Sequence, residues 1–226
     1  MNNEVVALFD LDGTLYNGHI WEALTRYHRQ QGQRRFIVAW YIISHLLPWP
    51  LYRLGLVREE TMYRAWGRDL SWLMKGFTEE EALQIFRHLW EQDISPALRP
   101  EVVARLREHQ AQGHQVVLVS GTFQELLKVV AAGLGVEHAV GTPLEMRDGR
   151  YTGRVDGPFC FGQDKVRGMQ ALLAETGWPV DWAASYAYAD SIHDLPLLEL
   201  VGHPVAVHPD ERLRAEAHRR GWEVMG

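Results

Sequence analysis

The hydrophobic pattern of the chain opens with a short uninterrupted apolar run, VVALF, at residues 5–9. A run without polar alternation is typical of a strand that is buried on both faces, as in a parallel sheet. Asp10 follows this run directly, and Asp12 comes shortly after it. The pattern therefore predicts a buried strand with two carboxylates at its carboxyl end.

From about residue 18 to residue 93 the pattern becomes helical. Ile20, Leu24 and Tyr27 recur at helical spacing. The sequence TEEE at 78–81 has the form of a capping box, which opens a helix. We expect this region to consist of helices without strands.

After Ser95-Pro96 the pattern alternates between apolar strand segments and helical segments, which favours a parallel sheet with helices on both faces. Asp148-Gly149 lies between two short extended segments and predicts an antiparallel hairpin. The predicted strands are VVLVS at 116–120, AVGT at 139–142, SYAYAD at 185–190 and PVAV at 204–207.

These periodicities predict an α/β protein with two parts. Residues 1–16 and 96–226 are expected to form a Rossmann-like, doubly wound parallel sheet. Residues 17–95 are expected to form an inserted α-helical cap. A chain of 226 residues suits one α/β domain with a smaller insertion better than two full domains.

One apolar segment at residues 36–57 is rich in tryptophan and tyrosine and has arginines near its ends. Its unbroken apolar part is shorter than the roughly 20 residues that a membrane span needs, and Pro48 and Pro50 end a helix there. We expect no transmembrane span. Contact with a membrane surface, a buried helix hairpin, a dimer face and a wall of an apolar leaving-group pocket remain as alternatives.

The composition is that of an ordinary soluble protein, with 46% hydrophobic residues, 23% charged residues and a formal net charge of -6. The basic residues are interspersed with acids, which argues against a nucleic-acid partner. Cys160 is the single cysteine and has no disulfide partner in the chain. Together with a start that lacks a signal-peptide pattern, this predicts a cytoplasmic protein. We expect either a monomer or a homodimer.

Polar residues follow several predicted strands at their carboxyl ends, where open parallel sheets bind ligands. Carboxylates that gather at one sheet edge repel one another unless a cation compensates them. No histidine or cysteine cluster accompanies them, which favours an ion that prefers oxygen ligands, such as Mg²⁺. The candidate metal ligands are Asp10, Asp12, Asp190 and Asp194.

A second group of residues is suited to holding a phosphate. Ser120-Gly121-Thr122 follows a predicted strand, and Thr122 and Glu125 have capping-box spacing, so free N–H groups at a helix start would face an anion. Lys165 lies at another predicted helix start and supplies a point charge for phosphoryl oxygens.

The order of these groups resembles the four motifs of the haloacid dehalogenase-like hydrolases. The helical insertion between the first two motifs, with a short flap before the lysine, is similar to the phosphoserine-phosphatase-like branch. The residues that carry the resemblance are Asp10-Leu11-Asp12-Gly13-Thr14, Ser120-Gly121-Thr122, Lys165 and Asp190-Ser191-Ile192-His193-Asp194.

The resemblance implies a magnesium-dependent phosphomonoesterase that acts on a small-molecule phosphate ester. Asp10 would be the nucleophile that forms an aspartyl phosphate, and Asp12 the general acid and then the general base. Mg²⁺ would be held by the Asp10 carboxylate, the Asp12 backbone carbonyl and Asp190.

The remaining motif residues would hold the phosphoryl group and the lysine. Ser120, the Gly121 N–H and Lys165 would bind the phosphoryl oxygens, and Asp194 would anchor Lys165 or a metal-bound water. Two alternatives remain: a phosphotransferase that passes the phosphoryl group to a second alcohol, and a non-catalytic protein that binds a phospholigand or a membrane surface.

The sequence departs from phosphoserine-specific enzymes at the position that grips the substrate ammonium, where His19 stands in place of a glutamate. Arg64 and Arg68 are candidates for binding a substrate carboxylate only by their position in the chain, and His193 lies between two motif acids. The identity of the leaving group is therefore left open.

Overall fold

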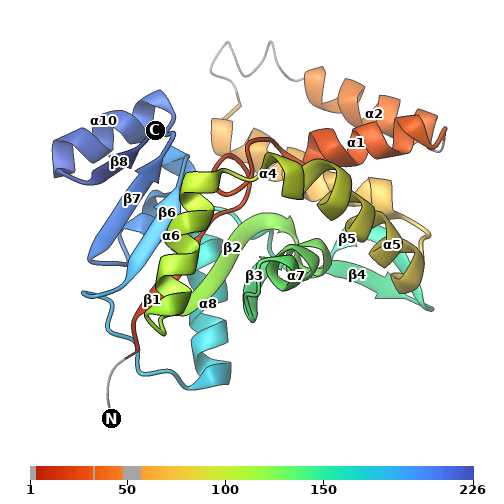
Figure 1. Cartoon of the computed structure of the whole chain (residues 1–226). Coiled ribbons are helices and arrows are strands. Elements are labelled where there is room, and N and C mark those ends of the chain that lie inside the picture. Colours follow the sequence, from red (N-terminus) through yellow and green to blue (C-terminus); the bar gives the residue numbers. More distant parts are fainter. Residues whose placement is uncertain (1–3, 33, 48–56) are drawn as a thin grey trace.

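The computed structural model describes residues 4–32, 34–47 and 57–226, and it is built around a six-stranded parallel sheet in the order β3-β2-β1-β6-β7-β8 (Figure 1). The chain runs from β1 outward through β2 to β3 on one side and then returns to β6, β7 and β8 on the other side, which is the topology of a doubly wound fold. The strands are β1 Val6–Phe9, β2 Gln115–Phe123, β3 His138–Thr142, β6 Tyr186–Ala189, β7 His203–Val207 and β8 Glu223–Met225.

Strand β1 is buried on both faces, as its sequence predicts. Val6 and Leu8 pack into a core cluster on one face, and Ala7 and Phe9 into a cluster on the other face. Helices α8 (Gln163–Thr176), α9 (Leu195–Leu198) and α10 (Glu211–Arg220) contribute to the first cluster, and α6 (Pro100–Ala111) and α7 (Gln124–Gly133) to the second. Helices thus cover both faces, which confirms the Rossmann-like fold class.

The strands predicted at 116–120, 139–142, 185–190 and 204–207 are all present. The predicted hairpin consists of β4 (Leu144–Arg147) and β5 (Arg150–Val155), which pair antiparallel. Its turn residues Asp148 and Gly149 have φ angles of 49° and 73°, as the tight turns of hairpins require. The short edge strand β8 was not predicted from the sequence.

Residues 17–95 hold helices and no named strand in the part that the structure describes. The capping box at 78–81 is confirmed: the Thr78 hydroxyl accepts from the Glu81 N–H at 3.2 Å, and the Glu81 carboxylate accepts from the Thr78 N–H at 2.8 Å. The helices are α1 Ile20–Gln30, α2 Arg35–Leu46, α4 Glu59–Asp69 and α5 Glu79–Leu89, with short turns η1 Leu70–Met74, η2 Trp90–Ile94 and η3 Ser95–Ala97.

The chain enters and leaves the helical region at neighbouring points. The Asn17 N–H donates to the Ala97 carbonyl at 2.9 Å, and the Arg99 N–H donates to the Leu15 carbonyl at 2.8 Å. The helical region therefore joins the sheet through two adjacent crossings above its carboxyl edge (Figure 1). The domain boundaries at 16/17 and 95/96 stay a prediction.

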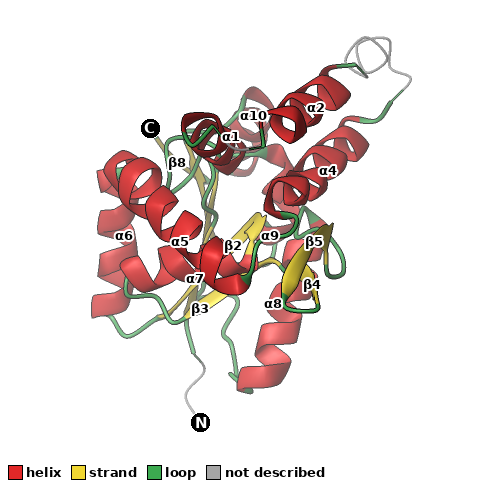
Figure 2. Ribbon diagram, turned by 90° about the vertical axis from the view of Figure 1, so that its right-hand side faces the viewer, coloured by secondary structure: helices red, strands yellow, loops and turns green. Residues whose placement is uncertain are grey.

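The β4–β5 hairpin packs against the helical region. The Gly76 N–H donates to the Tyr151 carbonyl at 2.7 Å, and the Tyr151 N–H donates to the Phe77 carbonyl at 2.9 Å. The Ser71 hydroxyl donates to the Gly153 carbonyl at 2.9 Å. Figure 2 shows the hairpin beside α4, so that helices and hairpin together cover one edge of the sheet.

The apolar segment predicted at 36–57 includes most of α2, whereas residues 48–56 lie outside the described part of the chain. Among the described residues, every helix is too short or too polar to cross a membrane.

Candidate active site

Asp10 and Asp12 lie at the carboxyl end of β1, where the sequence predicts them. The Asp10 N–H donates to the Tyr188 carbonyl at 3.0 Å, which continues the pairing of β1 with β6, and the Asp10 side chain is buried. Asp12 Oδ2 accepts from the Ile20 N–H at 3.3 Å, whereas Asp12 Oδ1 is buried without a partner among the described residues. One carboxylate oxygen thus faces the interior without a hydrogen bond.

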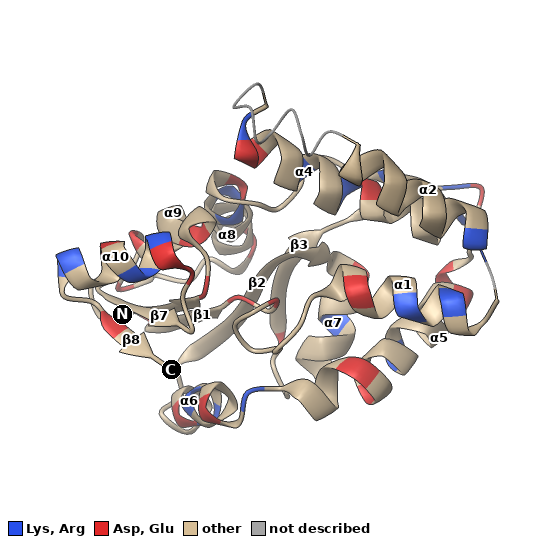
Figure 3. Cartoon of the chain, turned by 90° about the horizontal axis from the view of Figure 1, so that it is seen from above, with Lys and Arg blue, Asp and Glu red and all other residues tan. Residues whose placement is uncertain are grey.

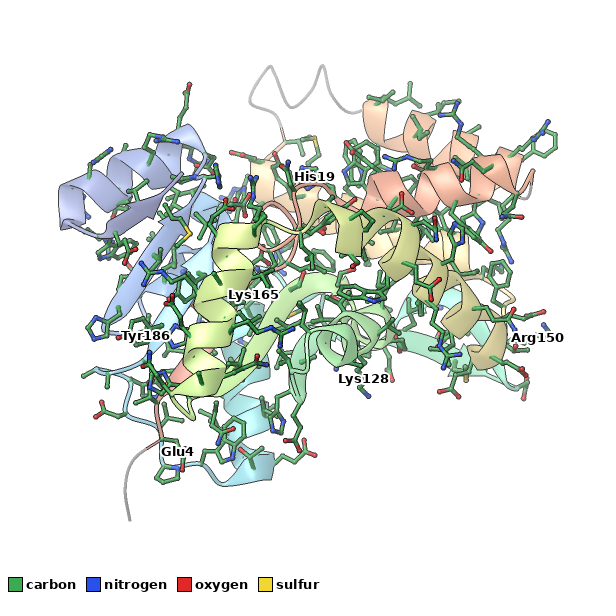
Figure 4. The ribbon with its side chains drawn as sticks, in the orientation of Figure 1. Glu4, His19, Lys128, Arg150, Lys165 and Tyr186 are labelled. Atoms are coloured by element: carbon green, nitrogen blue, oxygen red, sulfur yellow. The ribbon has the colours of Figure 1, made fainter. Side chains whose placement is uncertain are left out.

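Lys165 lies in the first turn of α8, and its ammonium group forms ion pairs with Asp10 and Asp194. Its Nζ atom lies 2.7 Å from Asp10 Oδ1 and 2.6 Å from Asp194 Oδ1. All three side chains are at most 6% exposed. In Figure 4, Lys165 lies in the middle of the molecule, whereas Lys128 lies on the outer side of α7. Asp194 thus anchors Lys165, which is one of the two roles considered from the sequence.

Asp190 completes a cluster of acids at this edge. Carboxylate oxygens of Asp10, Asp190 and Asp194 lie within 4.8 Å of one another. Asp12, which was predicted to bind the metal through its backbone carbonyl, contributes no side-chain oxygen to this set. Thr14 donates from its hydroxyl to Asp190 Oδ1 at 3.3 Å; sequence reasoning gave Thr14 no role, although it stands in the same motif as Asp10.

Gly13 is the residue that lets the loop after β1 pass close to Asp190. Its φ is +80°, a left-handed conformation that favours glycine. A Cβ atom at this position would collide with Asp190 Oδ2. The glycine therefore brings the backbone that carries Asp12 directly against the acid cluster.

Burial and mutual repulsion raise the pKa of three of the acids. Burial, opposed by Lys165, raises the pKa of Asp10 to about 6. Burial and the neighbouring Asp10 raise the pKa of Asp12 to about 8, and burial with the charge of Asp10 raises that of Asp190 to about 8. Burial lowers the pKa of Lys165, but Asp10 and Asp194 more than offset this, so that the net shift is upward.

The Ser120-Gly121-Thr122 segment differs from its prediction in one respect. Strand β2 continues to Phe123, so that Thr122 does not cap α7, and the predicted Thr122–Glu125 capping box is wrong. The cause is pairing with β3: Phe123 pairs with Thr142, whose hydroxyl donates to the Gly121 carbonyl at 2.9 Å. This non-local contact keeps the backbone extended beyond Ser120.

Some of the buried polar atoms near Ser120 form hydrogen bonds, and others have no partner among the described residues. The Ser120 hydroxyl is buried and accepts from the Thr122 N–H at 3.3 Å. Glu125 Oε1 accepts from the Leu144 N–H at 3.2 Å instead of capping the helix. The Thr122 hydroxyl and Glu125 Oε2 are buried without a partner in the described part of the chain.

The cap meets the sheet domain beside Lys165. Arg64 of α4 donates to Asp164 Oδ2 at 2.6 Å and to the Phe161 carbonyl at 3.1 Å. The His193 Nε2 atom lies 3.5 Å from Glu59 of α4. Arg64 and His193, two leaving-group candidates from the sequence, are therefore engaged at the junction between cap and sheet.

The other two candidates have different surroundings. Arg68 pairs with Asp69 at 3.0 Å within the cap. His19 is the N-cap residue that precedes α1, and its side chain makes no capping hydrogen bond. Phe159, which was not predicted, packs between α4 and β2, because a Cβ atom added at either Gly67 or Gly121 would meet its ring. In the sequence, the only signal for this packing is that Phe159 is an aromatic residue a few positions before Lys165.

Comparisons with known proteins agree with this geometry. The family model of haloacid dehalogenase-like hydrolases matches residues 7–199. A Mycobacterium tuberculosis protein named as a probable phosphatase is 36% identical in an alignment of 195 positions that covers 78% of this chain and 67% of that protein. Histidinol-phosphatase of Neisseria meningitidis is 30% identical in an alignment of 239 positions that covers 97% of each chain.

Among solved structures, a substrate-bound phosphoserine phosphatase matches with a TM-score of 0.65 and 18% identity, covering 100% of this chain and 94% of that one. At this identity the match shows the fold alone, and it is the fold that the sequence motifs predict. The family match extends through the acids after β1 and β6 and through Lys165. The chain therefore belongs to the haloacid dehalogenase-like hydrolase family.

Proposed function

We propose that this protein is a magnesium-dependent phosphomonoesterase that forms an aspartyl phosphate on Asp10. The observation that carries the proposal is the buried Lys165 ammonium, which is held between Asp10 and Asp194, whereas Asp12 and Asp190 at the same edge form no ion pair with any described residue. Such a site is suited to an anion and a divalent cation bound together.

The donor set fits Mg²⁺. Asp10, Asp190 and Asp194 offer oxygen atoms within 4.8 Å of one another, and oxygen is the ligand that this ion prefers. Asp194 already pairs with Lys165, so we assign the metal to the Asp10 carboxylate, Asp190 and the Asp12 backbone carbonyl. When bound, the ion withdraws charge from the phosphoryl oxygens and lets an anionic nucleophile approach.

Asp10 is the proposed nucleophile. Lys165 fixes one of its oxygens by a charge-assisted hydrogen bond of 2.7 Å, which orients the carboxylate. A carboxylate oxygen of Asp10 forms a bond to phosphorus, and the bond from phosphorus to the ester oxygen breaks. The leaving oxygen then needs a proton.

Asp12 is the proposed source of that proton. Its pKa of about 8 keeps it protonated at neutral pH, and its Oδ1 atom has no described partner. After the alcohol has left, the Asp12 carboxylate takes a proton from water, whose oxygen attacks phosphorus and releases phosphate from Asp10. One residue thus serves both half-reactions.

Lys165, the Ser120 hydroxyl and the Gly121 N–H are the proposed binding groups for the phosphoryl oxygens. Ser120 comes two residues after Leu118, the last residue of β2 that pairs with β1, and Lys165 lies in the first turn of α8. The phosphatase relatives, one of them named histidinol-phosphatase, support a small-molecule phosphate ester as the substrate.

The direct test is release of inorganic phosphate from a generic aryl phosphate by the purified protein. We expect release with Mg²⁺ and its loss in EDTA, with recovery when excess Mg²⁺ is added back. Release that is equally fast in EDTA would contradict the metal assignment. If the aryl phosphate is inert, a panel of small phosphate monoesters replaces it, and metal-dependent release from none of them would refute the proposal.

Mg²⁺ binding is expected to strengthen between pH 6 and pH 8. Asp10 and Asp190 ionise with pKa values of about 6 and 8 instead of 3.8, so protons compete with the metal at the lower pH. Without metal, the folded state retains protons that the unfolded state has lost, and the unfolding free energy falls as pH rises from about 4 to 8.

Thermal unfolding measures this effect. The rise in melting temperature caused by Mg²⁺ should be larger at pH 8 than at pH 6, and Asp190→Asn should remove most of it. A Mg²⁺ effect that is independent of pH, or that is unchanged in Asp190→Asn, would show that the metal binds elsewhere.

A further inference from the structure

Helix α2 uses one of its faces to pack against the rest of the cap. Val38, Tyr41 and His45 are buried on this face. The Tyr41 hydroxyl donates to the Trp66 carbonyl at 3.1 Å, and His45 Nε2 lies 3.5 Å from Asp69 Oδ2. These contacts hold the helix in place and fix which side chains point outward.

The opposite face carries a continuous apolar row. Phe36, Trp40, Ile43 and Leu47 are 92%, 60%, 50% and 68% exposed. Their spacing of four, three and four residues puts them along one side of the helix. Isolated exposed apolar residues are ordinary, but an ordered row of four on one helix face marks an interaction surface. We call this row the α2 apolar row.

A groove of about 450 Å³ runs beside the row, between α2, η1 and β5. Phe36, Trp40 and Trp72 form its apolar walls, and Lys75 and Arg154 lie along its margin. Both basic residues are exposed, and within the described ranges neither forms an ion pair. The groove therefore combines apolar walls with two exposed basic side chains.

The segment of the chain that carries the row has charge of one sign only. Although the whole chain has a formal charge of -6, residues 23–58 contain six arginines and no aspartate or glutamate. Figure 3 shows basic positions at the start of α2 and a helix without acidic positions along its length. Among the described residues, most of the exposed large apolar side chains lie on α2. This helix belongs to a long segment of the chain that contains no aspartate or glutamate.

These features decide between two occupants. A second copy placed on the row by a twofold axis would bring two basic surfaces together, which like charge opposes. An anionic lipid surface matches both features, because aromatic and aliphatic side chains enter the acyl boundary while arginine and lysine meet lipid phosphates. We propose that the α2 apolar row docks the cap on an anionic lipid bilayer, with Lys75 and Arg154 at the headgroups.

Co-sedimentation with vesicles tests this without any turnover. The full chain is expected to bind vesicles of phosphatidylglycerol and phosphatidylcholine, and to bind phosphatidylcholine vesicles at least about ten-fold more weakly, because each basic residue near an anionic surface contributes on the order of 1 kcal/mol. Added salt should weaken binding to the anionic vesicles. Phe36→Ser combined with Trp40→Ser should lower binding at least about ten-fold.

The controls separate this proposal from a change in folding and from the proposed catalysis. Met146→Ser alters an exposed apolar residue outside the row and should bind as the unaltered chain does. Asp10→Asn should also bind normally, whatever its activity. Lys75→Gln combined with Arg154→Gln should weaken binding to anionic vesicles only.

Several results would overturn the proposal. They are the absence of vesicle binding by the unaltered chain, equal binding to both kinds of vesicle, and full binding by the Phe36→Ser/Trp40→Ser variant with an unchanged melting temperature. A dimer in size-exclusion chromatography with light scattering, lost in that double variant, would instead identify a second copy as the occupant.

Discussion

Replacing Asp10 with asparagine is expected to lower metal-dependent phosphate release on the order of a thousand-fold or more. The neutral amide cannot attack phosphorus, and it is a poorer metal ligand than a carboxylate. The side chain keeps its size and can still accept a hydrogen bond from Lys165, so we expect a folded protein. Phosphate release and circular dichroism, measured on the same preparation, check both parts.

The matched control for this variant is Asp93→Asn. Asp93 is a mostly buried aspartate whose side chain is 10% exposed and which pairs with Arg26 at 2.7 Å, away from the acid cluster. It should release phosphate at nearly the rate of the unaltered chain. Substantial metal-dependent release by Asp10→Asn would rule out Asp10 as the nucleophile, whereas equal loss in both variants would point to a general effect on folding.

Replacing Lys165 with methionine is expected to destabilise the metal-free protein by about 3–5 kcal/mol, the usual effect of removing one partner of a buried ion pair. The change leaves Asp10 and Asp194 close together in a dry site without a positive charge. The carboxylates then gain protons or the fold loosens. Urea unfolding at pH 7 in EDTA measures the loss.

Mg²⁺ should restore part of this stability, because it replaces some of the missing positive charge, but it should not restore phosphate release. Lys128→Met is the control, since Lys128 is exposed on α7, and its unfolding free energy should change by less than about 0.5 kcal/mol. An equally small change in Lys165→Met would mean that the ion pairs contribute little to the folded state.

The Asp10 and Lys165 variants both act on the same property of the site, which is that it holds more carboxylates than cations and is buried from water. Burial and the charge of Asp10 raise the pKa of both Asp12 and Asp190, and Lys165 balances only part of the negative charge. Removing the cation or the nucleophile therefore changes the protonation of its neighbours as well as the chemistry. We therefore expect Lys165→Met to be much less stable than Asp10→Asn.

The amino-acid sequence by itself determined the parts of this protein that follow from local pattern. The apolar run before Asp10 required burial on both faces, and Asp148-Gly149 required a tight turn. The capping box at 78–81 and the alternating segments after residue 95 located helices and strands correctly. Because the carboxyl ends of parallel strands share one edge, the order of the motifs already brought the candidate residues together.

Only the tertiary structure decided the features that depend on contacts between distant segments. Pairing with β3 kept β2 extended through Thr122, against the local helix-start signal. The side chain of Lys165 met both Asp10 and Asp194 because α8 packs on the face of the sheet that buries Val6 and Leu8 of β1. Packing also decided which face of α2 stayed exposed. The sequence of α2 is apolar on both sides of the helix, and its pattern alone does not tell which side the neighbouring elements cover.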